Sequence, residues 1–115
     1  MSDCIFCKIA AKEIPSNSVY EDEQVIAFRD LEPQAPEHVL IIPKKHIASL
    51  MELETSDKDL ISHIMIDVLP EVAKKLGVAE DGFRLVVNMG KNGNQTVPHL
   101  HFHLLGGRMM QWPPG

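Results

Sequence analysis

Three histidines alternate with apolar residues near the end of the chain, in the segment His99–Leu105. Successive side chains of a β-strand point to opposite faces, so His99, His101 and His103 are expected on one face and the apolar residues between them on the other. A neutral imidazole is both a nucleophile and a proton carrier near pH 7. The pattern therefore indicates catalysis, in which one ring attacks while a neighbouring ring holds an anion or protonates a leaving group.

Two other interpretations of the three histidines stay open at this point. One is a polar, solvated sheet face, and the other is a metal site, since two histidines two residues apart on a strand can ligate zinc. The preceding loop, residues 90–96, favours catalysis, because its glycines allow close backbone approach and its amides and hydroxyl can donate to phosphate oxygens. The same loop also has the composition of an ordinary glycine-containing hairpin turn.

The two cysteines, Cys4 and Cys7, form a Cys-x-x-Cys pair. Two cysteines are too few for a disulfide framework, and this spacing in a reducing compartment indicates metal or redox chemistry. The redox interpretation is the weaker of these, because no expected strand precedes the pair as a thioredoxin-like site requires. A third interpretation is a pair of small buried residues.

The composition limits the classes of protein to which the chain can belong. Its 115 residues are expected to form one domain, residues 1–115. The 16 acidic and 11 basic residues give a net charge of −5, which argues against non-specific nucleic-acid binding through a basic face. The longest apolar runs are four residues, so no membrane span is expected. The first residues lack the profile of a signal peptide, and we expect a cytoplasmic location.

Short strands and one long helix are expected to position these residues in an α+β domain built on an antiparallel sheet. Ser56–Asp59 has the form of a capping box, and apolar residues then recur with a helical period until Gly77. Pro70 lies inside this helix and should bend it or break one hydrogen bond. The other expected elements are a short helix or turn within residues 4–13, strands at residues 19–21, 25–29, 38–42, 83–88 and 99–105, and an irregular tail at residues 106–115.

The chain resembles the histidine triad (HIT) superfamily, whose motif is three histidines alternating with hydrophobic residues. The likeness runs from Ile5 to Gly115 in the family's order and is to the Hint branch, the histidine triad nucleotide-binding proteins. It rests also on the segments Phe28-Arg29-Asp30, Pro33-Gln34-Ala35-Pro36, Ile42-Pro43-Lys44-Lys45-His46, Val86-Val87-Asn88, Gly106-Gly107-Arg108 and Trp112-Pro113-Pro114-Gly115. The resemblance implies a HIT-like fold, a five-stranded antiparallel sheet with one long and one short helix. It also implies a homodimer with a ten-stranded sheet, in which the tail, residues 106–115 with Trp112, lies at the interface and reaches the partner's site.

The resemblance further implies a purine nucleoside phosphoramidase. In that branch the residue at the position of His101 is the nucleophile, which attacks the α-phosphorus and forms a covalent nucleotidyl-histidine that water later cleaves. His103 is expected at the phosphate and near the leaving group, His99 has a more structural role, and His38 supports the triad. The alternatives are a dinucleoside polyphosphate hydrolase or nucleotidyl transferase of the same superfamily, and a nucleotide- or zinc-binding regulatory protein with incidental turnover.

The resemblance also assigns the contacts to a purine nucleotide, AMP or GMP and their conjugates. Asp30 aligns with the ribose-binding acid of the family. Asn94 replaces a usual glycine, which asparagine tolerates at positive φ, and Thr96 keeps the hydroxyl of the common serine. The expected walls of the base pocket are Leu31, Ile5, Phe6, Ile14 and Phe28, and the expected phosphate-side donors are Asn88, Asn94, Gln95 and Thr96.

Some bacterial-type members of the family join a Cys-x-x-Cys pair to two histidines around zinc. Their positions fall here on Cys4, Cys7, His46 and His99. Such a zinc is expected to be structural and to tie the N-terminus to the sheet, with no cofactor required for catalysis. If His99 is a metal ligand, it cannot also act as a proton carrier.

Overall fold

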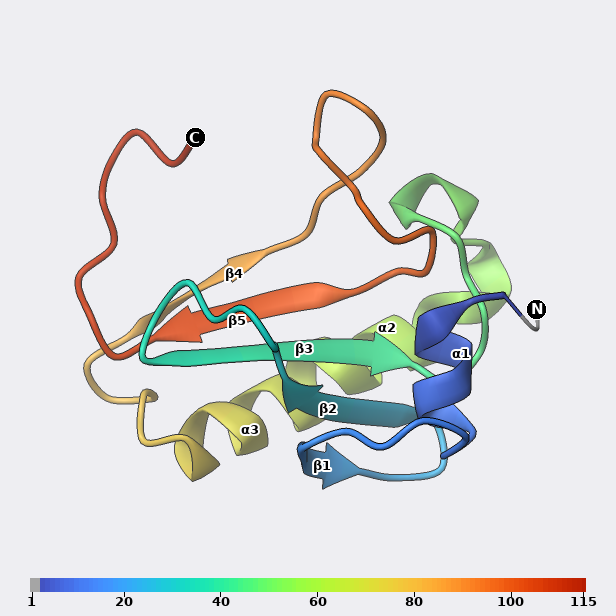
Figure 1. The fold of residues 1–115 in the computed structure, drawn as a ribbon, viewed down its shortest axis with the longest axis horizontal. Coiled ribbons are helices and arrows are strands. Elements are labelled where there is room, and N and C mark those ends of the chain that lie inside the picture. Colours follow the sequence, from blue (N-terminus) through green and yellow to red (C-terminus); the bar gives the residue numbers. More distant parts are fainter. Residues whose placement is uncertain (1–2) are drawn as a thin grey trace.

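A computed structural model describes residues 3–115 of the chain (Figure 1). Five strands form one sheet in the order β1-β2-β3-β5-β4, and every neighbouring pair is antiparallel. The expected five-stranded antiparallel sheet is therefore confirmed. The strands are β1 (Ser18–Glu21), β2 (Val25–Arg29), β3 (Glu37–Pro43), β4 (Phe83–Val86) and β5 (Phe102–Gly106).

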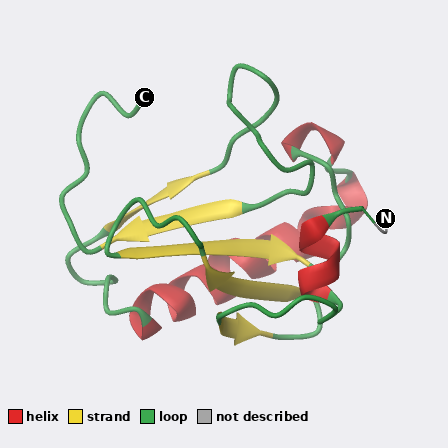
Figure 2. Cartoon of the chain, in the orientation of Figure 1, coloured by secondary structure: helices red, strands yellow, loops and turns green. Residues whose placement is uncertain are grey.

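Helices cover both faces of the sheet (Figure 2). The short helix α1 (Ile5–Ala10) packs on one face and the long helix packs on the other. Along the central strands the side chains alternate, so that Val25 and Val39 belong to the core under the long helix while Ile26 and Leu40 belong to the smaller core under α1. Among the helices of residues 3–115, none combines the length and apolar character that a membrane crossing requires.

Three helical segments follow one another without a break and confirm the expected long helix. They are α2 (Lys58–Ser62), η3 (His63–Val68) and α3 (Leu69–Lys75). The middle segment is π-helical and ends just before Leu69-Pro70. A proline has no N–H to donate and its ring crowds the carbonyl one turn earlier, which a widened turn relieves. The expected disturbance at Pro70 thus takes the form of a π-helical segment.

The expected capping box at Ser56–Asp59 is wrong by two residues. The short 3₁₀-helices η1 (Leu50–Glu52) and η2 (Thr55–Asp57) precede α2, and Glu54 caps η2. The backbone N–H of Glu54 donates to Oδ2 of Asp57 at 2.9 Å. The other oxygen of Asp57 accepts from Nζ of Lys45 at 2.6 Å. Asp57 therefore both caps η2 and binds Lys45, which lies 12 residues earlier in the sequence. The pattern of residues around position 56 gives no sign of this second contact.

The last strand begins at Phe102, and the expectation that it begins at His99 is wrong. Its neighbour β3 ends at Pro43, which has no N–H with which to continue the ladder. The N–H of Leu100 instead donates to the carbonyl of Ile47 in the loop after β3, at 2.6 Å. The alternation persists nonetheless, because Leu100 and Phe102 belong to the core under the long helix. The strand β4 likewise ends two residues earlier than the expected position 88.

Candidate active site

The backbone fixes which nitrogen of His101 can carry a proton. Its Nδ1 lies 2.7 Å from the carbonyl oxygen of His99. A carbonyl oxygen only accepts hydrogen bonds, so Nδ1 is the donor. In a neutral imidazole the other nitrogen then keeps its lone pair. Nε2 of His101 is therefore available as a nucleophile or a base.

His38 and His103 form a hydrogen-bonded pair beside His101. The backbone N–H of Gln34 donates to Nδ1 of His38 at 3.0 Å, so a neutral His38 carries its proton on Nε2. That Nε2–H donates to Nδ1 of His103, also at 3.0 Å. A neutral His103 then carries its own proton on Nε2, and its ring centroid lies 5.0 Å from that of His101. The ring of His103, which carries an Nε2–H donor, thus lies next to the ring of His101, whose Nε2 has a lone pair.

Burial keeps these two imidazoles neutral. It lowers the pKa of His38, although the negative charge of Asp30 acts in the opposite direction. The Oδ2 atom of Asp30 lies 3.6 Å from Nε2 of His38. Burial, together with repulsion from the imidazoles of His101 and His38, lowers the pKa of His103 to about 4. Both rings are thus uncharged near neutral pH, as the hydrogen-bond directions above require.

The helix α1 brings an aromatic ring against the histidine segment. Phe6 packs edge-on against His99, His101 and Phe28, with centroid distances of 5.8, 5.1 and 5.7 Å. Phe6 and Phe28 are buried in one apolar cluster, and Ile14 packs against it. Three of the five residues expected to line a base pocket, Phe6, Phe28 and Ile14, therefore lie together between α1 and the sheet.

The other two expected pocket residues are solvent-exposed. Ile5 is 48% exposed and Leu31 is 98% exposed. Asp30 immediately precedes Leu31, and its Oδ1 accepts the backbone N–H of Glu32 at 2.8 Å. This bond leaves Oδ2 of Asp30 on the side of His38.

The expected phosphate donors lie in the segment between β4 and β5 and have different surroundings. Asn94 has a φ of +60°, which confirms the expectation that asparagine tolerates this backbone conformation. Thr96 is exposed and lines a hollow of about 440 Å³ together with Ile5 and His46. Asn88 is partly buried just after β4.

Gln95 differs from the other donors because its side chain binds the protein itself. Its Nε2 donates to the carbonyls of Ala48 and Val97 at 2.8 and 3.0 Å, and its Oε1 accepts the backbone N–H of Gly90 at 3.3 Å. Both amide protons are thus in use within the chain. The side chain of Gln95 holds the loop in place beside the histidine segment.

Trp112 lies in the tail that follows β5. Its side chain is 81% exposed, and the guanidinium carbon of Arg84 lies 5.9 Å from the centroid of its ring. Arg84 belongs to β4, so the tail of this chain runs past the β4 edge of the sheet.

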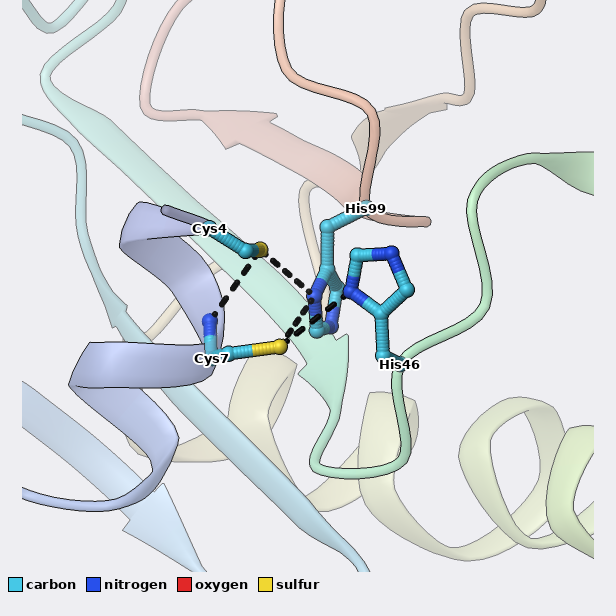
Figure 3. A group of neighbouring side chains, drawn as sticks. All are labelled: Cys4, Cys7, His46 and His99. Carbon is cyan, nitrogen blue, oxygen red and sulfur yellow. Dashed lines mark hydrogen bonds between the residues drawn. The ribbon is translucent and has the colours of Figure 1, made fainter. Parts of the chain in front are cut away.

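Four side chains bring two sulfur and two nitrogen atoms within 4.8 Å of one another: Cys4, Cys7, His46 and His99 (Figure 3). Sγ of Cys7 lies 3.2 Å from Nδ1 of His46, and Sγ of Cys4 lies 3.3 Å from Nδ1 of His99. A tetrahedral zinc with bonds of about 2.3 Å to sulfur and about 2.0 Å to nitrogen separates these atoms by roughly 3.6 Å. The donor types and their spacing fit a metal ion.

His99 connects this cluster to His101. Its Nε2 lies 2.8 Å from the carbonyl oxygen of Pro43 and must donate, so the lone pair of Nδ1 faces the two cysteine sulfurs. Its side chain is fully buried, and this burial lowers its pKa. The backbone carbonyl of the same residue accepts from His101. One residue therefore presents a ligand atom to the cluster and orients the neighbouring imidazole.

Comparison with known families and structures agrees with this geometry. The HIT domain family matches residues 11–110. The chain belongs to the HIT family. An uncharacterized HIT-like protein of Synechococcus elongatus is 50% identical to it over 113 residues, which are 98% of this chain and 97% of that protein.

Solved structures of other HIT proteins share the fold closely. A HIT family hydrolase from Legionella pneumophila is 51% identical, with a TM-score of 0.94 over 98% of this chain and 100% of that one. A histidine triad protein from Clostridium difficile is 49% identical, with a TM-score of 0.92 over 96% of both chains. The chain is thus a HIT protein with hydrolase-like relatives.

The groups of this HIT domain that sequence reasoning missed belong to the backbone. They are the N–H of Gln34 and the carbonyls of His99 and Pro43, each of which selects the protonated nitrogen of a histidine. No residue type marks such groups. The nearest signal is the pair of prolines around Gln34, which predicts an irregular loop a few residues before His38.

Proposed function

We propose that this HIT protein is a purine nucleoside phosphoramidase of the Hint type, which hydrolyses a P–N bond through a covalent nucleotidyl-histidine. One observation carries the proposal. The carbonyl of His99 holds Nδ1–H of His101 at 2.7 Å, which leaves Nε2 as the nucleophile. The ending Trp112-Pro113-Pro114-Gly115, which resembles the Hint branch, favours this activity over hydrolysis of dinucleoside polyphosphates or nucleotidyl transfer.

The first step is the attack of Nε2 of His101 on the α-phosphorus. A bond from phosphorus to Nε2 forms, and the bond from phosphorus to the leaving nitrogen breaks. The leaving amine takes a proton from Nε2 of His103, whose ring is adjacent to that of His101. The pKa of His103 in the free protein is about 4, and the negative charge of a bound phosphate raises it. We therefore expect His103 to take up a second proton, on Nδ1, when substrate binds, and its hydrogen bond from His38 to break at that point.

The second step is hydrolysis of the nucleotidyl-histidine. Water attacks the phosphorus and gives a proton to His103, and the bond from phosphorus to Nε2 of His101 breaks. The products are a nucleoside monophosphate and the free enzyme. Since His101 is only 5% exposed and His103 is only partly buried, we expect the phosphate to approach from the side of His103.

The nucleotide is placed by the residues around this pair. Oδ2 of Asp30 is positioned to accept a ribose hydroxyl, as the family resemblance implies. The cluster of Phe6, Phe28 and Ile14 supports one wall for the purine, and the exposed side chains of Ile5 and Leu31 are free to cover it. Asn88, Asn94 and Thr96 are the proposed donors to the phosphate, and Gln95 holds their loop.

We further propose that Cys4, Cys7, His46 and His99 hold a structural zinc ion. Zinc bound by two thiolates and two imidazoles has a closed coordination shell and supplies structural cohesion, not catalysis. The two cysteines come from the start of α1 and its N-terminal flank, and the two histidines come from loops beside the sheet. The four side chains would therefore tie α1 to the histidine segment.

A homodimer completes the proposal. The strand β4 pairs with β5 on one side, and within residues 3–115 no strand pairs with its other side. Apolar side chains are exposed around this edge, with Phe83 37%, Met109 90% and Trp112 81% exposed. Free strand edges and exposed apolar patches are commonly covered by a partner. We propose that a second copy joins this edge to give ten strands and that each tail reaches the partner's site.

The test compares hydrolysis of adenosine phosphoramidate with hydrolysis of a diadenosine polyphosphate by the same preparation. We expect the phosphoramidate to turn over faster and mass spectrometry of quenched reactions to detect a nucleotide attached to His101. Faster cleavage of the polyphosphate would identify a dinucleoside polyphosphate hydrolase instead. Tight nucleotide binding with turnover close to the uncatalysed rate would identify a regulatory binding protein.

A further inference from the structure

A chain of hydrogen bonds joins the segment after β5 to the histidine pair. Nη2 of Arg108 donates to the backbone carbonyl of Gln34 at 2.9 Å. The backbone N–H of Gln34 donates to Nδ1 of His38 at 3.0 Å, and Nε2 of His38 donates to Nδ1 of His103 at 3.0 Å. An exposed side chain is thus linked through two residues, Gln34 and His38, to the ring of His103 beside His101.

The approach of Arg108 to Gln34 depends on the residue before it. Gly107 has a φ of +91°, and a Cβ built at this position would lie 2.8 Å from Cβ of Pro36. Glycine alone adopts this conformation readily and permits this contact. Gly107 therefore lets the chain turn directly against the loop that contains Gln34, and this turn places the Arg108 side chain over the Gln34 carbonyl.

The contact from Gln34 decides between two tautomers of the histidine pair. A neutral His38 and a neutral His103 can share a hydrogen bond with both protons on Nε2 or with both protons on Nδ1. In the second arrangement the lone pair of Nε2 of His38 accepts from Nδ1–H of His103, and Nε2 of His103 has no proton. Because the N–H of Gln34 can only donate, it requires a lone pair on Nδ1 of His38 and selects the first arrangement.

We propose that Arg108 is a positioning residue, which holds the loop Pro33–Pro36 so that Gln34 keeps His38 and His103 protonated on Nε2. The consequence for turnover rests on the proposed function, because there Nε2 of His103 is the donor to the leaving nitrogen. The tautomers themselves exist in the free protein and can be measured without a substrate.

The experiment records long-range ¹⁵N–¹H correlation spectra of the histidine rings in labelled full-length protein, which distinguish protonated from unprotonated ring nitrogens. Arg108→Met removes the donor and keeps a long side chain, and we expect a larger share of Nδ1-protonated His38 and His103. Arg108→Lys retains a cationic donor and is expected to restore part of the wild-type signal. Lys75→Met is the matched control, since Nζ of Lys75 also donates to a backbone carbonyl, that of Val19, at 2.6 Å but far from His38.

Kinetics provide the second measurement. We expect Arg108→Met to lower kcat for adenosine phosphoramidate by roughly tenfold with little change in KM, since misplaced catalytic groups act on the chemical step. Gly107→Ala is expected to shift the same tautomers and serves as a second variant if Arg108→Met does not fold. Unchanged His38 and His103 spectra in the folded variant would overturn the inference, even if kcat fell. If the wild-type protein does not hydrolyse phosphoramidates, the proposed function fails, while the spectra still decide the role of Arg108.

Discussion

His103 and His63 lie in different layers of the molecule and have opposite electrostatic surroundings. His103 is flanked by other imidazoles, and burial lowers its pKa to about 4. His63 lies on the long helix between two carboxylates, with Nδ1 3.0 Å from Oδ2 of Asp67 and Nε2 2.7 Å from Oδ2 of Asp22. Carboxylate oxygens accept, so both ring nitrogens of His63 donate, and these hydrogen bonds raise its pKa.

The two surroundings suit a histidine for different tasks. An imidazolium has no lone pair, so a ring like His63 can tie elements together but cannot attack a phosphorus. Oδ2 of Asp22 also accepts from the hydroxyl of Tyr20 at 2.6 Å, and this bond raises the pKa of Tyr20 to about 12. Against the effect of burial, the hydrogen bonds from Tyr20 and His63 lower the pKa of Asp22 to about 2. The cluster of Tyr20, Asp22, His63 and Asp67 is a structural tie, whereas the neutral pair beside His101 keeps a lone pair and a donor for chemistry.

The largest difference is expected when each site loses an imidazole. His101→Ala removes the proposed nucleophile, so turnover of adenosine phosphoramidate should fall about a thousandfold or more, which is about 4 kcal/mol of barrier. His63→Ala should leave turnover close to that of the wild type, because His63 touches neither His101 nor its partners. Steady-state kinetics and equilibrium binding of AMP check both variants, and binding should be retained in each. Normal turnover by His101→Ala would show that another group is the nucleophile.

Metal removal probes a third histidine environment, in which the lone pair of His99 faces sulfur. A metal present at a hundred times its Kd stabilises the folded protein by about 2.7 kcal/mol, so chelation should lower Tm clearly. Cys7→Ser should have a lower Tm from the start and lose little more on chelation, while His63→Gln should respond to chelation as the wild type does. Metal analysis of protein purified without chelator is the direct check. A zinc content far below one per chain would end the zinc proposal.

Asp30 lies near a histidine, His38, that stays uncharged in spite of the neighbouring carboxylate. Its effect on His38 is outweighed by burial, unlike the effect of Asp22 on His63. Asp30→Ala should therefore change substrate recognition more than histidine protonation. We expect the preference for ribonucleotides over deoxyribonucleotides to weaken by more than tenfold, about 1.5 kcal/mol for a hydrogen bond to a charged group. Competition binding of AMP and dAMP measures this, and an unchanged preference would remove Asp30 from the ribose site.

The same comparison shows how far the sequence could be used. The alternation of histidines with apolar residues predicted that one face carries the imidazoles and the other enters the core. This was possible because the alternation of side chains between two faces is a local property of an extended chain. The role of His63 could not be predicted in this way, because its partner Asp22 lies 41 residues earlier and meets it only in the folded protein. The helical pattern alone gives His63 no partner.

Which nitrogen of each imidazole carries the proton could not be predicted from the sequence either. It depends on the carbonyls of His99 and Pro43 and on the N–H of Gln34. Every residue has a backbone carbonyl and every residue except proline has a backbone N–H, so residue type does not reveal which of them will meet a histidine. The orientation of the Gln95 side chain also depends on backbone groups. Its residue type suits a phosphate donor, yet nearby carbonyls of Ala48 and Val97 take both of its amide protons.

The smallest expected effect is the pH dependence of stability, and it has opposite signs for the two histidines. An unfolded histidine titrates with a pKa of about 6.5. The pKa of folded His63 lies above this value, so His63 stabilises the fold fully below the unfolded pKa, and this contribution is lost as the pH rises through the folded pKa. His63→Gln should therefore cost more at pH 5.5 than at pH 9, by about 0.5 to 1 kcal/mol for a partly exposed ion pair.

For His103 the sign is reversed, because its folded pKa of about 4 lies below the unfolded value. As the pH falls from about 6.5 towards 4, the unfolded chain binds a proton that the folded protein excludes, and stability decreases. His103→Gln should remove this loss and flatten the acid side of the stability curve. His63→Gln should leave that slope unchanged and should instead remove the loss of stability that the wild type shows as the pH rises above about 6.5. Urea unfolding of the wild type and the two variants from about pH 4 to about pH 9 measures both slopes. Parallel slopes would mean that the two rings do not differ in charge, and the contrast between a structural and a chemical histidine would then have to be abandoned.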